Sequence, residues 1–425
     1  MFALVYILLF ILGTYVIYKV KGTIISVAFV FLIMWTIWPM LTVFGIFGLN
    51  KPELKVHLLI VSSIVCFIIG FLLVKGEKTP QIKVNQQNEE KIHIKPLIIL
   101  NILSYLIIVP YTIKAIKIIN TFGFSYLRHI STINSPELID NTISHIIIYL
   151  FIVSLYTANI LLLIAQLIKT KKLNYKLLIL SVVGALLVSF TFAARATLVK
   201  YLMYFGIGLF VIKDFYKTII EKKVLLFSLL GVLIITIIIT TQRLASNMNV
   251  IGNIVLYYSG SVNLLEYYME NPSFSLMGVK NFYGTISLGF IYNNIPNVTY
   301  VLFKTPYFGS DSAITSITAI PINVNHNLSL NAIPTTIYYF VMDFGYFGSQ
   351  VLFFIFGFVM ALIERKTYKN QSIRMYAIYL FLAYIVFKSI QNYDLLFPES
   401  FFVLFYIIIF TIDFRKGVNI EKKII

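Results

Sequence analysis

The sequence predicts an all-α, polytopic integral membrane protein with about eleven transmembrane helices and one long extracytoplasmic loop. Hydrophobic residues make up 59% of the 425 residues, only 12% are charged, and the mean hydropathy is +0.88. These values lie outside the range of soluble globular proteins. The apolar residues also gather into runs long enough to span a bilayer, and basic residues recur between alternate runs.

The apolar runs define the expected helices in order. A helix needs roughly 17–25 mostly apolar residues to cross a bilayer. The runs that meet or approach this length are 3–18, 24–47, 57–74, 96–119, 145–168, 177–192, 198–212, 224–241, 336–363, 376–390 and 401–414. Residues 177–212 can also be read as one re-entrant pair. The first run has no Lys or Arg before Lys19 and is longer than a signal-peptide core, so we expect a retained anchor.

Lysine and arginine gather in alternate connections, which the positive-inside rule places in the cytoplasm. These connections lie around residues 19–21, 75–95, 169–176, 213–223, 365–374 and 415–423 and hold most of the 34 basic residues. The amino terminus is therefore predicted outside and the carboxyl terminus in the cytoplasm. The same distribution explains the formal charge of +17, so the charge does not indicate a nucleic-acid partner.

Three parts follow from this topology. Residues 1–241 hold the first eight helices, 242–335 form the long extracytoplasmic loop, and 336–425 hold the last three helices and a cytoplasmic tail. The single cysteine, Cys66, excludes a disulfide within the chain. No Cys/His cluster and no Gly-x-x-x-x-Gly-Lys-Ser/Thr motif occurs in the sequence, so we expect neither a dedicated metal site nor a cofactor.

Two arginines are conspicuous because the predicted outside connections hold few cations. Arg195 lies in the small-residue turn Ala193-Ala194-Arg195-Ala196, and Arg243 lies at the entry to the long loop. A charge at the centre of an inserted helix costs about 2.5–3.5 kcal/mol, so a group near hydrocarbon needs compensation. We interpret the two arginines as a site for one phosphate-bearing ligand, which guanidinium groups bind bidentately. The alternative is that each anchors its helix end at the membrane interface.

Three ionisable residues are candidates for a general base. His326 in the long loop is the first, because imidazole titrates near neutral pH, although a solvated surface histidine is the alternative. Glu266 and Asp343 are rival bases. Asp343 lies in a predicted helix, where an ionisable group indicates function or pairs with an arginine.

Further residues are candidates for substrate binding. Lys200, about one turn into the helix after Arg195, adds a point charge, and Arg128 lies in another predicted outside loop. Tyrosine faces suit sugar rings as well as the membrane interface. The remaining candidates lie in the long loop and at its exit: Tyr257, Tyr258, Ser259, Glu266, Thr335 and Tyr338.

Three short motifs, together with the order of the helices, carry a family resemblance. They are the arginine in its small-residue turn, the Tyr-x-Ser-Gly-Ser entry at 257–261, and the return Pro-Thr-Thr-x-Tyr…Asp-Phe-Gly-x-x-Gly at 334–348. In these features the chain resembles the Wzy-type oligosaccharide repeat-unit polymerases of O-antigen and capsule synthesis. Related O-antigen ligases carry a His-Asn nine residues before a Gly-x-x-Gly. Here that register falls on Pro334-Thr335, which favours polymerase over ligase.

The resemblance implies an inverting, lipid-dependent glycosyltransferase in the cytoplasmic membrane of a bacterium. It would transfer a glycan from undecaprenyl pyrophosphate to a lipid-linked repeat unit, with Arg195 and Arg243 stabilising the leaving pyrophosphate. A loop base would deprotonate the acceptor hydroxyl. A chain-length-determining co-polymerase is a further partner compatible with the resemblance. The alternatives are a lipid-linked oligosaccharide flippase or other transporter, an O-antigen ligase and a membrane acyltransferase.

Overall fold

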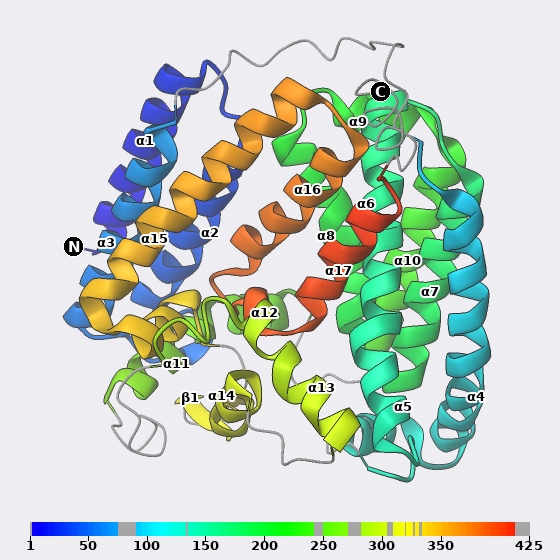
Figure 1. Ribbon diagram of the computed structural model, residues 1–425. Coiled ribbons are helices and arrows are strands. Elements are labelled where there is room, and N and C mark those ends of the chain that lie inside the picture. The colour runs from blue at the N-terminus through cyan, green and yellow to red at the C-terminus, as the bar shows by residue number, and fades with distance from the viewer. Residues whose placement is uncertain are drawn as a thin grey trace.

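A tall bundle of helices makes up most of the molecule, and a layer of shorter elements covers one end of it (Figure 1). We call the covered end, which carries the described residues between 250 and 330, the loop end, and the opposite end the far end. The structure, a computed structural model, describes residues 2–74, 91–132, 135–241, 250–270, 282–303, 309–318, 320–325, 328–330 and 334–412.

The bundle helices run between the two ends. Those in the first half of the chain are α1 (Phe2–Lys21), α2 (Val27–Val43), α3 (Leu54–Leu72), α4 (Ile94–Thr132), α5 (Thr142–Ile146), α6 (Val153–Thr170), α7 (Tyr175–Phe192) and α8 (Arg195–Val211). A π-helical turn, Ile147–Ile152, joins α5 to α6. The others are α10 (Lys223–Thr241), α15 (Thr336–Asn370), α16 (Ile373–Lys388) and α17 (Glu399–Ile409), and the short α9 (Phe215–Glu221) lies at the far end.

Seven of the described helices are long and apolar enough to cross a membrane. They are Phe2–Lys21, Leu54–Leu72, Ile94–Ser131, Ile143–Thr170, Tyr175–Phe192, Lys223–Thr241 and Thr336–Asn370. Large apolar side chains such as Leu4, Leu106 and Phe227 are exposed on them, which requires lipid rather than water around the bundle. The prediction of an all-α, multi-pass membrane protein is therefore confirmed, whereas the number of about eleven crossings stays a prediction.

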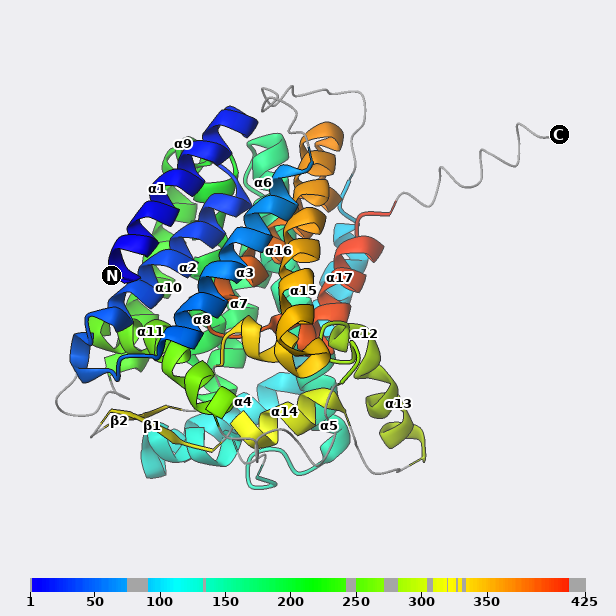
Figure 2. The same ribbon diagram turned by 90° about the vertical axis from the view of Figure 1, so that its left-hand side faces the viewer.

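The segment predicted as a long loop is largely helical where the structure describes it. α11 (Val250–Glu270) lies across the loop end and is followed by α12 (Gly289–Tyr292), α13 (Asn294–Phe303), α14 (Ser310–Thr318) and an antiparallel hairpin of β1 (Ile322–Asn325) and β2 (Leu328–Leu330). Figure 2 shows this layer below the bundle. α11 escaped prediction because Ser, Asn and Glu interrupt its apolar residues, so it contains no run of membrane-spanning length.

Two further predictions concern the bounds of helices in the first half of the chain. The helix predicted to end at residue 119 continues as α4 to Thr132 with a break at Gly123, where φ is 86°. Arg128, predicted in a loop, therefore lies on a helix. Residues 177–212 form the two helices α7 and α8, and of these α7 is long and apolar enough to cross a membrane, whereas a crossing by α8 stays a prediction.

α3 and α15 touch through two glycines. A Cβ atom on Gly70 would overlap the Phe354 carbonyl oxygen, and one on Gly357 would overlap the Phe67 carbonyl oxygen. The two backbones are therefore in direct contact, because small residues let membrane helices approach closely. This crossing fixes α15 against the first helices of the chain.

We expect Gly70→Ala to destabilise the protein by roughly 1–3 kcal/mol, because overpacking a close contact forces the backbones apart. Gly231→Ala in α10 is the matched control, since a Cβ atom there meets nothing within 4 Å. Thermal unfolding in detergent should give a lower midpoint for Gly70→Ala only. Equal midpoints for the two variants would contradict the backbone contact.

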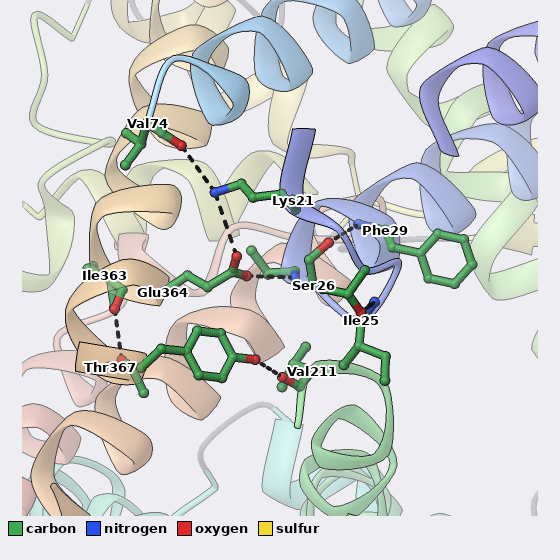
Figure 3. A network of polar contacts seen from close by, with 12 residues as sticks. Lys21, Ile25, Ser26, Phe29, Val74, Val211, Ile363, Glu364 and Thr367 are labelled. Atoms are coloured by element: carbon green, nitrogen blue, oxygen red, sulfur yellow. Dashed lines mark hydrogen bonds and ion pairs between the residues drawn. The ribbon is translucent and has the colours of Figure 1, made fainter. Parts of the chain in front are cut away.

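A buried ion pair ties α1 to α15 near the far end (Figure 3). Lys21 Nζ lies 3.9 Å from Glu364 Oε1 and donates to the Val74 carbonyl oxygen at 3.2 Å. Glu364 Oε2 accepts from the Val27 amide at 3.2 Å and from the Tyr379 hydroxyl at 2.6 Å. One carboxylate thus connects α1, α2, α15 and α16.

Glu364→Gln should destabilise the protein by about 3–5 kcal/mol, because it leaves the Lys21 ammonium buried without its counter-ion. The double variant Lys21→Met/Glu364→Gln removes both charges and keeps an acceptor for the Val27 amide, so it should recover much of the loss. Unfolding midpoints of the two variants and the wild type measure this. A double variant no more stable than Glu364→Gln would show that the buried ammonium is not the cause.

Candidate functional site

Arg195 begins α8 at the loop end, in the turn that the sequence predicts. α7 ends at Phe192, and the next residue, Ala193, has φ 46° and ψ 35°. The Ala194 amide donates to the Ser189 carbonyl oxygen at 3.0 Å. The small side chains suit this tight left-handed turn, which larger residues adopt less readily. Arg195 Cζ lies 5.5 Å from the centroid of the Tyr257 ring of α11, within cation–π range. Two candidates from distant parts of the sequence therefore lie together.

Lys200, one and a half turns further along α8, joins a cluster of charges. Asp394 Oδ1 accepts from Lys388 Nζ at 2.7 Å, and Asp394 Oδ2 lies 4.0 Å from Lys200 Nζ. We call these three residues the lysine bridge. The side chain of Asp394 is 11% exposed, but those of Lys200 and Lys388 are 29% and 27% exposed. Two cations therefore share one carboxylate, and both stay partly accessible.

The pKa of Asp394 is lowered in the folded protein. Burial alone would raise it, but the ammonium groups of Lys388 and Lys200 outweigh that effect. Asp394 begins the 3₁₀ turn Asp394–Leu396 that leads from α16 to α17, and its carbonyl oxygen accepts from the Ser400 hydroxyl at 2.7 Å. The bridge is thus an ionic contact at neutral pH, held on a fixed turn.

Glu399 adds a second carboxylate at the start of α17. Its charged neighbours are Lys200, Asp394 and Asp311. Its Oε2 atom is buried and has no hydrogen-bond partner among the described residues. Because buried carboxylate oxygens are normally hydrogen-bonded, this atom is a candidate for contact with a ligand hydroxyl.

Lys388, Asp394 and Glu399 were not predicted as site residues, because they lie in what appears in the sequence as a plain connection between two helices. A signal was nevertheless present. They are the only charged residues between Arg374 and Asp413, in a stretch that is otherwise apolar or neutral. A cluster of ionisable groups beside membrane helices is a functional hypothesis by default.

The return motif at 334–348 lies against the same connection. The Thr336 amide donates to the Ser389 carbonyl oxygen at 2.8 Å, next to Lys388. The predicted substrate-binding residues Thr335 and Tyr338 are buried nearby on this wall of the loop end, and within the described part of the chain their hydroxyls have no hydrogen-bond partner.

Asp343 accepts hydrogen bonds from backbone amides. It is buried, and its carboxylate accepts the amides of Gly284, Ile286 and Ser287 at 3.1, 3.2 and 2.6 Å, together with the Ser287 hydroxyl. These four donors occupy the carboxylate. Asp343 therefore holds segment 284–287 against α15, and its role as a base stays a prediction.

Glu266, Tyr258 and Ser259 lie on α11 but contact the bundle. Glu266 Oε1 accepts from the Glu53 amide at 2.5 Å, just before α3. The Tyr258 ring stacks 4.7 Å from the Trp38 ring, and the Ser259 hydroxyl donates to the Trp38 carbonyl oxygen at 3.2 Å. These contacts hold α11 on the bundle and give the three candidates structural roles.

The remaining candidates stay predictions. Arg243 and His326 lie outside the described residues. Arg128 lies on α4 three residues before Ser131, whose hydroxyl donates to the Phe192 carbonyl oxygen at 3.1 Å. Arg128 is therefore placed near the turn that carries Arg195.

The loop end also holds lysines that the sequence did not single out. Lys55 lies 3.2 Å from Glu53 and 3.0 Å from Glu270, and Lys114 lies 2.6 Å from Asp140. These pairs are exposed, and such pairs contribute little to stability. The lysine bridge differs from them because its carboxylate is buried.

Comparisons of the chain with protein-family models, curated proteins and solved structures find no match. Among the described residues, no group of three or more His, Cys, Asp or Glu side chains could hold a metal ion.

Asp394→Asn should lower the stability at neutral pH by on the order of 3 kcal/mol, because two ammonium groups lose their counter-ion. The lowered pKa of Asp394 means that its contribution is full above the unfolded-state pKa of about 3.9 and is lost as the pH falls below it. The difference in unfolding midpoint between wild type and variant should therefore shrink as the pH falls from about 5 through the lowered pKa of Asp394. A constant difference would rule out the ionic bridge.

Proposed function

We propose that the protein joins undecaprenyl-pyrophosphate-linked oligosaccharide repeat units into a surface polysaccharide such as O-antigen or capsule. The observation that carries this proposal is the lysine bridge, whose Lys200 lies on α8 five residues after Arg195. On this proposal its cations bind the diphosphate of a membrane lipid. The resemblance to the Wzy-type polymerases supplies the reaction class, which the geometry alone does not give.

On this proposal the chain crosses the bacterial cytoplasmic membrane about eleven times. The helices α2, α8, α16 and α17, with 17, 17, 16 and 11 residues, add four crossings to the seven long ones. The loop end lies outside and the carboxyl terminus in the cytoplasm. The basic last turns of α1, α6 and α15 at the far end support this orientation.

In the proposed reaction, the acceptor sugar's hydroxyl oxygen attacks the anomeric carbon of the donor glycan. The bond from that carbon to the pyrophosphate oxygen breaks with inversion, and the lipid pyrophosphate leaves with the bonding electrons. Arg195, Lys200 and Lys388 stabilise the charge that develops on it, because fixed cations in a partly dehydrated site need no reorganisation. The acceptor proton passes to a carboxylate, and Glu399 Oε2 is the described candidate; His326 is its rival.

Asp394 acts in this scheme as a resident counter-ion. It keeps Lys200 and Lys388 facing each other when no ligand is bound. A diphosphate carries more negative charge than one carboxylate and accepts hydrogen bonds from both ammonium groups, so it competes for them effectively. The ring of Tyr257 beside Arg195 offers a face to a sugar.

A lipid-linked oligosaccharide flippase would recognise the same diphosphate, and a ligase would use the same leaving group. The three activities differ in the glycan that reaches the surface when the protein is missing. A polymerase mutant displays single repeat units, whereas a flippase or ligase mutant displays none. A co-polymerase that sets chain length would alter the ladder without abolishing it.

A deletion strain complemented with variants tests the proposal on a surface-glycan gel. Wild type and Lys217→Ala, a far-end control paired with Asp214 at 3.0 Å, should restore the ladder. Arg195→Ala and Lys388→Met should extend chains roughly 100-fold more slowly, because each removes one group that stabilises the leaving charge.

Equal amounts of each variant in the membrane, measured by immunoblot, are the required control. Loss of even single repeat units in the deletion strain would favour the flippase or ligase. Full ladders from both Arg195→Ala and Lys388→Met would make the arginine an interfacial anchor and the bridge a purely structural contact.

A further inference from the structure

An apolar stripe is exposed on segment 282–303, which includes α12 and α13. The segment contains no Asp, Glu, Lys or Arg, although the chain as a whole has a formal charge of +17. The large side chains exposed on it are Leu288 (57%), Ile291 (53%), Tyr292 (43%), Ile295 (60%), Val298 (54%) and Phe303 (71%). Soluble surfaces rarely expose so many neighbouring apolar side chains, so something apolar covers this stripe.

Spacings of three and four residues relate the five side chains from Leu288 to Val298, which places them on one face of the segment. The opposite face is fixed to the protein. Asn293 Nδ2 donates to the Leu396 carbonyl oxygen at 2.7 Å, and Asn293 Oδ1 accepts from the Ser310 amide at 2.9 Å. A Cβ atom on Gly289 would overlap the backbone of Leu396, so α12 lies directly on the turn that follows Asp394. Because these contacts fix the opposite face, the stripe faces away from the protein.

The stripe continues the exposed apolar surface of a candidate spanning helix. Phe344, Tyr346 and Phe347 of α15 are exposed beside the break at Gly345. A Cβ atom on Gly284 would lie 3.4 Å from the Phe344 ring, so the two surfaces adjoin. Figure 2 shows α12 and α13 beside the starting end of α15 and projecting sideways from the bundle. Lipid that surrounds α15 is thus positioned to cover the stripe.

We propose that segment 282–303 is an interfacial anchor whose apolar stripe inserts into the surface of the bilayer at the loop end. An amphipathic helix that lies in the membrane interface needs an apolar face of this kind. The exposed rings of Tyr283 and Tyr292 suit the head-group region. The inference goes beyond the proposed function and does not depend on it.

The anchor would set the depth of the site in the membrane. The Tyr393 hydroxyl donates to the Ser287 carbonyl oxygen at 2.9 Å, and Asn293 is bonded to Leu396. Tyr393 and Leu396 lie on either side of Asp394. A segment held at the bilayer surface therefore holds the lysine bridge at the level of the lipid head groups.

Fluorescence quenching tests the anchor on the full-length protein. Cys66 is the only cysteine, so single cysteines can be introduced into a Cys66→Ser background and labelled. Ile295→Cys and Val298→Cys report on the stripe, and Ser316→Cys in α14 is an exposed control in the same layer. In phosphatidylcholine nanodiscs, a nitroxide on the lipid should quench the stripe labels about threefold more than the control, and aqueous iodide should show the reverse order.

Quenching of the stripe labels by iodide as strongly as Ser316→Cys would overturn the proposal. Protection from both quenchers, with disulfide cross-linking of two copies through Ile295→Cys, would also overturn it, because a second copy would then cover the stripe. Both positions are exposed, so the substitutions should not disturb folding. Glycan synthesis plays no part in the readout, which keeps this test separate from that of the proposed function.

Discussion

The geometry of the loop end depends on the carboxylate of Asp343. It lies near the start of α15, before the break at Gly345, and receives three backbone amides and one hydroxyl from segment 284–287. A buried carboxylate is costly without such donors, and amides outside regular helix need an acceptor. One side chain meets both needs and fixes the covering layer to a candidate spanning helix.

From this contact a continuous set of hydrogen bonds leads to the lysine bridge. The Ser287 carbonyl oxygen accepts from the Tyr393 hydroxyl, and the Asn293 side chain donates to the Leu396 carbonyl oxygen. The same layer therefore contacts the turn that carries Asp394 on both sides. Lys200 and Lys388 come to that carboxylate from α8 and α16. The cations are thus placed by the layer and the bundle together. A change in how the layer sits would alter their separation.

The bundle was predictable because lipid imposes length and low polarity on each crossing. The position of Arg195 at the end of a bundle helix was predictable for the same reason, whereas its role in a site stays a prediction. The lysine bridge was not predictable from the sequence. Lys388 at a helix end resembles an ordinary interfacial lysine, and its pairing with Asp394 and Lys200 depends on tertiary packing. α11 was missed because its apolar face contacts protein rather than lipid, which leaves a weaker pattern in the sequence.

The position of the tryptophans has a practical consequence. The chain has two, and both lie on α2. Trp35 Nε1 donates to the Ser389 hydroxyl at 2.7 Å, next to Lys388, and Trp38 stacks against Tyr258 of α11. The intrinsic emission of the unlabelled protein therefore arises from the two contacts that join α2 to the covering layer and to the site. Changes in these contacts can be followed optically, without a dye, in the native chain.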